Sequence, residues 1–187
     1  PKEDASASML SSGIAYPATL TQHVIAAAAD SQMVKDQLAS PAINVMNGEL
    51  DVHKGYMGKF AVTQEEIDAM KPSLDNLSYT SYMVRVAYDE SEVEVLAAVL
   101  SCAYSYEVIA KKIVANRPES VDDPFYGDWI RGYASDGYAA GNVILIETLD
   151  RLSAHYTEEQ LRHLEDIFIA CSRYEMVFWQ MAWEMRQ

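Results

Sequence analysis

The sequence of 187 residues is poor in cysteine and in positive charge, and both shortages narrow the class of protein. Its two cysteines, Cys102 and Cys171, are too few and too widely spaced for the disulfide framework of a secreted domain. We therefore expect reduced thiols and a cytoplasmic protein. Lysine and arginine number 14 against 28 aspartates and glutamates, and the net charge of −14 repels nucleic-acid phosphates and anionic lipids. The charge thus disfavours a protein that binds nucleic acid or a membrane surface.

Long apolar runs are missing as well. The uncharged stretch from Met9 to Ala29 contains Pro17, Gln22 and His23, so no membrane span is predicted. The first residues lack the basic stretch followed by an apolar one that marks a signal peptide. Half of the residues are nonetheless hydrophobic, which indicates a folded chain with enough residues for one domain and a substantial core.

Helical spacing of the apolar residues dominates, and no segment shows sustained two-residue alternation. Three predicted helices open on a capping box, and Pro41 and Pro124 suit first helical turns; the boxes are Thr63–Glu66, Ser91–Glu94 and Thr157–Gln160. The clearest predicted loop extends from Asn116 to Pro124. We predict an all-α fold with a single domain over residues 1–187. Its helices are expected at about 2–15, 18–37, 41–60, 63–70, 78–89, 91–116, 124–135, 137–155 and 157–186.

The predicted helix from Ser91 to Asn116 places Cys102 on an apolar stripe, one turn before Tyr106. The stripe consists of Val95, Ala98, Val99, Cys102, Tyr106, Ile109 and Ile113, and the opposite side of Glu92, Glu94, Ser101, Ser105, Lys111 and Lys112. Cys102 is therefore expected inside, near a tyrosine whose hydroxyl needs a partner. Taken alone, this pattern favours a small core residue over a functional thiol, because buried free cysteine is common.

The last predicted helix contains one ionisable residue, Glu175, on its apolar face. The other members of that face are Leu161, Leu164, Phe168, Cys171, Phe178 and Ala182. A carboxyl group in such surroundings loses hydration, which raises its pKa, unless it gains a hydrogen-bond donor. A buried acid with a raised pKa can transfer protons near neutral pH. The pattern is equally compatible with a glutamate that only hydrogen-bonds a neighbouring tyrosine.

Tyrosine is abundant, with twelve copies against four phenylalanines. Such polar-tipped aromatics suit either a pocket for a flat heterocycle or an ordinary core whose hydroxyls reach the surface; the candidates are Tyr79, Tyr82, Tyr104, Tyr106, Tyr126 and Tyr133. No metal site is predicted. Glu49 and His53 are one turn apart, but His155 and His163 bring no carboxylate at ligand spacing, and there is no cysteine pair for zinc.

Four segments together resemble the TenA/thiaminase II family. They are LSYTSYM (Leu77–Met83), LSCAYSYEV (Leu100–Val108), YGDWIRGYAS (Tyr126–Ser135) and SRYEMVFWQMAW (Ser172–Trp183). Each segment alone is weak, but their order and spacing make the match specific. The resemblance implies a haem-oxygenase-like helical bundle, usually a homotetramer, that uses no haem, metal or other cofactor.

The resemblance also implies a chemistry, the hydrolysis of a small-molecule aminopyrimidine of thiamin salvage. The expected reaction converts 4-amino-5-aminomethyl-2-methylpyrimidine to the hydroxymethyl pyrimidine and ammonia, with thiamin cleavage as a related activity. The family's nucleophile matches Cys102, and its proton-transferring glutamate matches Glu175. A thiolate that adds to the ring makes it electron-rich enough to expel a poor leaving group. The substrate-binding matches are Tyr79, Tyr106, Tyr133 and Phe178.

One substrate-binding position departs from the family pattern. The family holds the pyrimidine with an aspartate on an early helix, and Ser11 and Ser12 stand at that place in this sequence. Ser12 can hydrogen-bond an amino group without charge, so we expect altered substrate recognition or lost activity. The family pattern also has a helix before Pro1 and a short stretch after Gln187, neither of which this sequence contains.

Two other functions fit the same fold. One is a non-catalytic pyrimidine-binding or regulatory homologue that uses the same pocket. The other is a metal-dependent oxidase, which needs several histidine and carboxylate ligands at one site.

Overall fold

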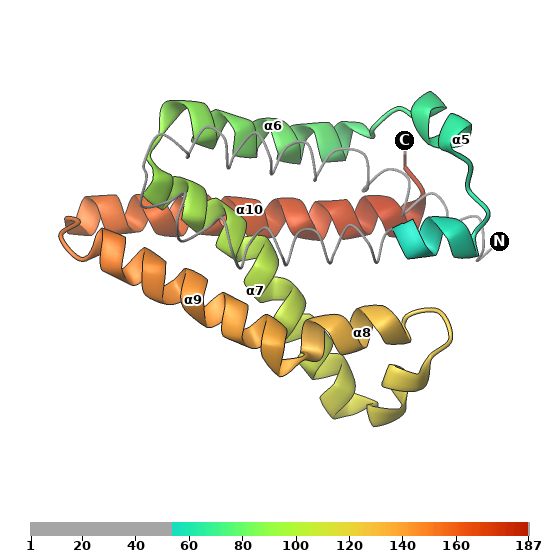
Figure 1. The fold of residues 1–187 in the computed structure, drawn as a ribbon. Coiled ribbons are helices and arrows are strands. Elements are labelled where there is room, and N and C mark those ends of the chain that lie inside the picture. Colours follow the sequence, from blue (N-terminus) through green and yellow to red (C-terminus); the bar gives the residue numbers. More distant parts are fainter. Residues whose placement is uncertain (1–53, 187) are drawn as a thin grey trace. The chain divides into compact units, whose positions relative to one another are not determined.

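The structure, a computed structural model, describes residues 54–186 of the chain. Every regular element in this range is helical (Figure 1), which confirms the predicted all-α fold for these residues. The predicted helices at 2–15 and 18–37 and most of the one at 41–60 lie outside the described residues, as do Pro41 and Ser12. Residues 54–59 are helical, in agreement with the end of the helix predicted at 41–60.

The chain divides into two compact units. Unit 1 comprises Pro1–Val95 together with Arg173–Gln187, and unit 2 comprises Leu96–Ser172. The division falls inside two helices, α7 (Glu92–Asn116) and α10 (Glu158–Glu184), so each of them contributes residues to both units. The single domain over residues 1–187 stays a prediction.

Unit 1 contains α5 (Gln64–Ala69) and α6 (Leu74–Asp89) in addition to the ends of α7 and α10. The predicted capping box of α5 is confirmed, because the Thr63 N–H donates to the Glu66 carboxylate at 2.8 Å and the Glu66 N–H donates to Thr63 Oγ1 at 3.2 Å. The start of α6 was predicted at residue 78 and lies at Leu74. Ser73 explains the difference, because its Oγ accepts the Asn76 N–H at 3.2 Å and so caps a helix that begins earlier.

The beginning of α6 is tied to the end of α10 by polar contacts within unit 1. Ser73 Oγ donates to the sulfur of Met181, and Arg186 pairs with Asp75 at 3.3 Å. Met181 is almost fully buried, so this junction belongs to the core of the unit.

Unit 2 contains the rest of α7 and α10, the 3₁₀ helix η1 (Pro118–Asp122), α8 (Gly127–Ala134) and α9 (Asp136–Ser153). α8 packs against η1 and against α9. The predicted helix start at Pro124 is wrong, because α8 begins at Gly127. The side chain of Asp123 accepts the N–H groups of Phe125 (2.8 Å) and Tyr126 (2.7 Å), which holds Pro124 in a turn before the helix.

The capping box predicted at Thr157 is confirmed, and the one predicted at Ser91 is confirmed for the bond to the Glu94 side chain. At α10, the Thr157 N–H donates to Gln160 Oε1 at 2.9 Å, and the Gln160 N–H donates to Thr157 Oγ1 at 3.3 Å. At α7, the Ser91 N–H donates to Glu94 Oε2 at 3.1 Å, whereas Ser91 Oγ accepts from Val93 at 3.2 Å. The capping role of Glu94 explains why its side chain is buried, although the sequence placed it on the polar side of α7.

The exposure of α7 changes along its length. Its first turns are enclosed on nearly all sides, including Ser101, which was predicted on the polar side and is 0% exposed. Its later turns have one accessible side, and Ile109, predicted on the buried stripe, is 40% exposed there. Within residues 54–186, α7 is also the one helix long and apolar enough to cross a membrane by length and composition alone, and half of that apolar stretch is buried inside the protein.

The predicted apolar face of α10 is largely confirmed. Leu164, Cys171, Glu175 and Ala182 are all buried at helical spacing, and Ile167 joins them. Leu161, in the first turn of the helix, is exposed, and Phe168 and Phe178 are half-buried. The burial of a glutamate on this face is therefore an observed feature of the fold.

Candidate active site

The structure divides the predicted site residues into two groups of three. The cysteine group, in unit 2, consists of Cys102, Tyr106 and Tyr133; the glutamate group, in unit 1, consists of Tyr79, Glu175 and Phe178. Ser12, the seventh predicted residue, lies outside the described part of the chain.

Cys102 lies on α7 at the point where the helix passes from its enclosed turns to its half-exposed ones. Its side chain is half-buried rather than fully inside as predicted, whereas Cys171 on α10 is 0% exposed. The Ser105 hydroxyl donates to the Cys102 carbonyl at 2.9 Å, within the same helical turn. A partly accessible thiol can meet a small molecule without unfolding the helix, which a fully buried one cannot.

Tyr106, one turn after Cys102, contacts an aromatic cluster built from α8 and α9. Its ring centroid lies 5.0 Å from that of Tyr133 and 5.7 Å from that of Trp129. Trp129 and Tyr133 are 4.8 Å apart, and Tyr138 of α9 meets the ring of Tyr133 at 4.9 Å in an edge-to-face arrangement. Tyr133 is buried, so the cluster forms one aromatic wall inside unit 2.

Trp129 and Tyr138 are members of this wall that sequence reasoning did not single out. The spacing of Trp129 and Tyr133 was a usable signal, because residues four apart share one face of a helix. Tyr138 gave no such signal, since its contact with Tyr133 crosses from α9 to α8. Tyr104 and Tyr126 were also pocket candidates, but both are exposed.

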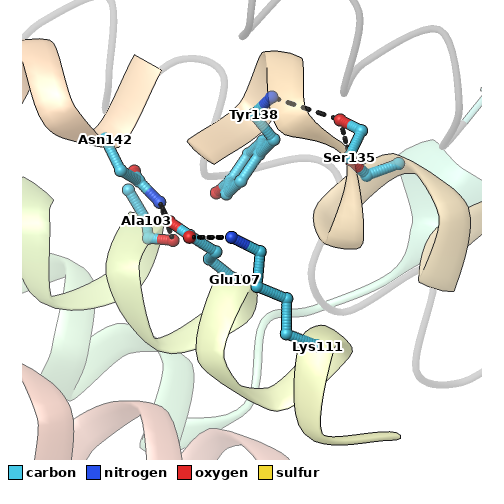
Figure 2. A network of polar contacts seen from close by, with 7 residues as sticks. Ala103, Glu107, Lys111, Ser135, Tyr138 and Asn142 are labelled. Carbon is cyan, nitrogen blue, oxygen red and sulfur yellow. Dashed lines mark hydrogen bonds and ion pairs between the residues drawn. The ribbon is translucent and has the colours of Figure 1, made fainter. Parts of the chain in front are cut away.

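A polar network crosses from α9 to α7 in the same turns of α7 (Figure 2). The amide nitrogen of Asn142 donates to the Ala103 carbonyl at 3.2 Å and to Glu107 Oε2 at 2.6 Å, and Lys111 Nζ meets Glu107 Oε1 at 2.7 Å. Burial, the largest single influence, raises the pKa of Glu107. The hydrogen bonds from Asn142 and Lys111 and the charge of Lys111 together hold that pKa below its ordinary value of 4.5.

The glutamate group is arranged around stacked tyrosines in unit 1. Tyr79 of α6 is buried and stacks on Tyr174 of α10, with ring centroids 5.5 Å apart and an interplanar angle of 9°. Glu175 follows Tyr174 directly and is 7% exposed. Phe178 lies one turn further along α10, with its ring edge-to-face on Trp179 at 6.1 Å. Tyr174, which sequence analysis did not single out, stacks on Tyr79 and directly precedes Glu175 in the chain.

The two groups offer complementary chemistry. The cysteine group provides an accessible thiol one turn from an aromatic wall, which suits nucleophilic attack on a flat heterocycle. The glutamate group provides a buried carboxyl group, which suits proton transfer. Within residues 54–186, no three histidine, cysteine, aspartate or glutamate side chains converge as metal ligands. The oxidase hypothesis therefore finds no ligand set in this part of the chain.

Comparison with known proteins relates this chain to one family. Residues 14–185 match the model of the TENA/THI-4/PQQC family. The chain is 37% identical over 153 residues to an aminopyrimidine aminohydrolase of Helicobacter pylori, and the alignment covers 82% of this chain and 70% of that protein. It is 39% identical over 141 residues to an aminopyrimidine aminohydrolase of Halalkalibacterium halodurans, with 75% and 62% covered. The chain thus spans 62–70% of the length of these relatives.

A solved structure gives the same answer for the fold. A TenA family transcription regulator from Silicibacter sp. TM1040 superposes with a TM-score of 0.81 at 24% identity, over 97% of this chain and 82% of that one. The likeness shows a shared fold, the haem-oxygenase-like helical fold of TenA proteins, as the sequence predicted.

Proposed function

Because this chain belongs to the TENA/THI-4/PQQC family, we propose that it is an aminopyrimidine aminohydrolase of thiamin salvage. Its substrate is 4-amino-5-aminomethyl-2-methylpyrimidine, and its products are the hydroxymethyl pyrimidine and ammonia. Thiamin itself is a second candidate substrate. The relatives from H. pylori and H. halodurans bear the name of this activity.

The structural observation that carries the proposal is the burial of Glu175. An ionisable side chain on the buried face of a helix loses hydration, and carboxyl groups in such surroundings are often found at functional sites. Glu175 also follows a tyrosine that stacks on Tyr79, a second predicted site residue. The proposal assigns proton transfer to this carboxyl group.

The proposed reaction begins when the Cys102 thiolate forms a C–S bond to the pyrimidine ring while Glu175 gives a proton to a ring nitrogen. The aminomethyl nitrogen is protonated near neutral pH, so the electron-rich ring expels it as neutral ammonia: the C–N bond breaks and its electron pair leaves with the nitrogen. The oxygen of a water molecule bonds to the same carbon, and the proton that the water loses passes to the solvent or to the released ammonia. The C–S bond breaks, the thiolate is regenerated, and the ring proton returns to Glu175. The sum is substrate and water giving alcohol and ammonia.

The aromatic residues of the two groups have a binding role in this scheme. Tyr106 and Tyr133 offer ring faces and hydroxyl groups to the pyrimidine. From the glutamate group, Tyr79 offers a ring face and a hydroxyl group, and Phe178 offers a ring face alone. Ser12 is proposed to accept a hydrogen bond from the ring amino group in place of the aspartate typical of the family.

The family relationship also supports a proposal about location and assembly. We propose that the protein is cytoplasmic and acts as a homotetramer. We also propose that it binds the small pyrimidine as its substrate and binds neither nucleic acid nor a membrane. Light scattering in solution measures the oligomeric state directly.

Ammonia release from 4-amino-5-aminomethyl-2-methylpyrimidine tests the function. We expect ammonia and the hydroxymethyl pyrimidine in equal amounts. The matched control is 4-amino-2,5-dimethylpyrimidine, which keeps the ring amino group but has no leaving group on the C5 methyl, and it should release no ammonia. Binding of the first compound without ammonia release would contradict the proposal and support a pyrimidine-binding homologue instead.

A further inference from the structure

The turn of α7 that carries Cys102 is joined to α9 by one buried amide. Asn142 is 3% exposed, and its nitrogen donates to the carbonyl of Ala103 and to the carboxylate of Glu107. Ala103 directly follows Cys102, and Glu107 directly follows Tyr106. Each acceptor residue is therefore the chain neighbour of a residue in the cysteine group. Figure 2 shows the hydrogen bonds from Asn142 to Ala103 and Glu107.

The geometry of these two bonds restricts rotation of α7 about its own axis. Ala103 and Glu107 lie one helical turn apart on the same face, and the oxygens of both meet the single amide nitrogen of Asn142. Both acceptors are oxygens, and only the NH₂ end of an asparagine side chain can donate to both. The bond to Glu107 is charge-assisted, which makes it the stronger of the two, and Lys111 holds the other carboxylate oxygen at 2.7 Å.

The same face of α9 also contacts the aromatic wall. Tyr138 lies one turn before Asn142 and packs edge-to-face on Tyr133, which in turn contacts Tyr106. α9 thus holds α7 through Asn142 and holds α8 through Tyr138. A rotation of α7 that moved Cys102 would break the Asn142 bonds, and it would shift Tyr106 against Tyr133.

We propose that Asn142 and Glu107 form a positioning pair that fixes the orientation of Cys102 and Tyr106 relative to the ring of Tyr133. Neither residue touches the reacting atoms in this scheme. Their effect on turnover rests on the proposed function, because it acts through the nucleophilic role of Cys102. Displacement of a reacting group by about 1 Å is enough to lower a rate by orders of magnitude.

Three substitutions separate this role from ordinary stabilisation. Asn142→Ala removes both bonds to α7, and Glu107→Ala removes the stronger acceptor. Glu107→Gln keeps an oxygen acceptor for Asn142 but loses the charge. Lys111→Ala is the matched control, because it removes the ion pair within α7 and leaves the contact between α7 and α9 intact.

The first measurement is the kinetics of ammonia release. In Asn142→Ala and Glu107→Ala we expect kcat to fall by about tenfold or more, with KM changed less than about threefold, because a displaced nucleophile affects the reaction more than binding. Glu107→Gln should recover most of the rate, and Lys111→Ala should match the wild type. Equal kcat values for Glu107→Ala and Glu107→Gln would overturn the proposal, even if Asn142→Ala fails to fold.

The second measurement does not depend on the proposed function. The rate at which iodoacetamide alkylates Cys102, read by peptide mass, reports the environment of the thiol even in a protein without turnover. We expect a change of about threefold or more in Glu107→Ala and Asn142→Ala and none in Lys111→Ala, with the buried Cys171 as an internal reference. Unchanged alkylation in the folded variants would contradict the positioning role. Altered alkylation without any wild-type ammonia release would uphold it and reject the hydrolase assignment.

Discussion

Among single residues, Glu175 is an ionisable side chain whose burial the sequence predicted and the structure confirms. If its carboxyl group transfers protons, Glu175→Gln keeps the shape and the hydrogen-bonding capacity but removes the transferable proton. We expect kcat to fall by about 100-fold or more, with substrate binding mostly retained. The control is Glu165→Gln, an exposed glutamate of the same helix, which should leave kcat unchanged. Weakened binding with a preserved kcat would instead make Glu175 a recognition residue.

Ser12 is the predicted substrate-binding residue whose contact with the pyrimidine is expected to be weakest. A neutral hydroxyl in place of a charged acceptor gives up one charge-assisted hydrogen bond. Ser12→Asp should therefore tighten aminopyrimidine binding by roughly tenfold, as measured by calorimetry. Ser11→Asp places the same charge one residue away and serves as the control. Binding that stays the same or weakens in Ser12→Asp would show that another residue holds the ring amino group.

At the scale of residues, the sequence predicted the burial of side chains on one helix face better than it predicted contacts between helices. The spacing of apolar residues on α10 was enough to place Glu175 on the buried face, because helical periodicity is a local property. The half-exposure of Cys102 was not predictable, since it depends on which parts of α7 other elements cover. The pairing of Asn142 with Glu107 joins residues 35 positions apart in sequence, and no local pattern reports such a contact.

At the scale of elements, the close approach of η1 to α8 depends on a glycine. A Cβ atom at Gly127 would lie 2.5 Å from the carbonyl oxygen of Val121, a backbone atom that cannot turn aside as a side chain can. Gly127→Ala should therefore destabilise the protein by about 1–3 kcal/mol, as measured by urea unfolding. Gly132→Ala in the same helix is the control. It has open space around it and should stabilise by about 0.5–1 kcal/mol. Equal stability of the two variants would contradict this packing.

The contact between α9 and α7 should make stability depend on pH. Hydrogen bonds from Asn142 and Lys111 hold the pKa of Glu107 below its ordinary value in the folded state, so folding favours the charged carboxylate. This contribution is fully present above about pH 4.5 and is lost as the pH falls through the lower, folded-state pKa. Urea unfolding between about pH 5 and pH 3 should show a smaller loss of stability in Glu107→Gln than in the wild type. If the free energy of unfolding depends on pH identically in the two proteins, Asn142 and Lys111 do not stabilise the charged carboxylate of Glu107 in the folded state.

Element boundaries were predictable where a side chain caps the helix in the usual way. Thr63 and Thr157 were recognised from their spacing to an acidic or amide residue three positions later. Ser73 was missed because the residue three positions later is Asn76 rather than the glutamate or glutamine of a capping box, although Ser73 caps α6 through the Asn76 N–H. The start of α8 was misplaced for a different reason. Pro124 suits a first helical turn, but Asp123 binds the next two N–H groups and forms a turn there instead.

At the scale of the whole molecule, the fold class and the family were available from the sequence. Helical periodicity, caps and the absence of alternating segments predicted the all-α class, and four short segments in a fixed order predicted the family that residues 14–185 match. The arrangement of the site was not available. Cys102 and Glu175 fall in different compact units of the chain, and only tertiary structure determines which side chains surround each of them.

The most direct test of the proposed function compares ammonia release from 4-amino-5-aminomethyl-2-methylpyrimidine by the wild type, Cys102→Ser and Cys171→Ser. Serine is close in size to cysteine but far less ionised near neutral pH, so attack on the ring should slow by orders of magnitude. We predict that Cys102→Ser loses turnover while its circular dichroism stays that of the wild type, and that Cys171→Ser, altered at a fully buried core position, keeps most of its activity. A folded Cys102→Ser variant that retains more than about a tenth of the wild-type rate would contradict the role of Cys102 as the nucleophile.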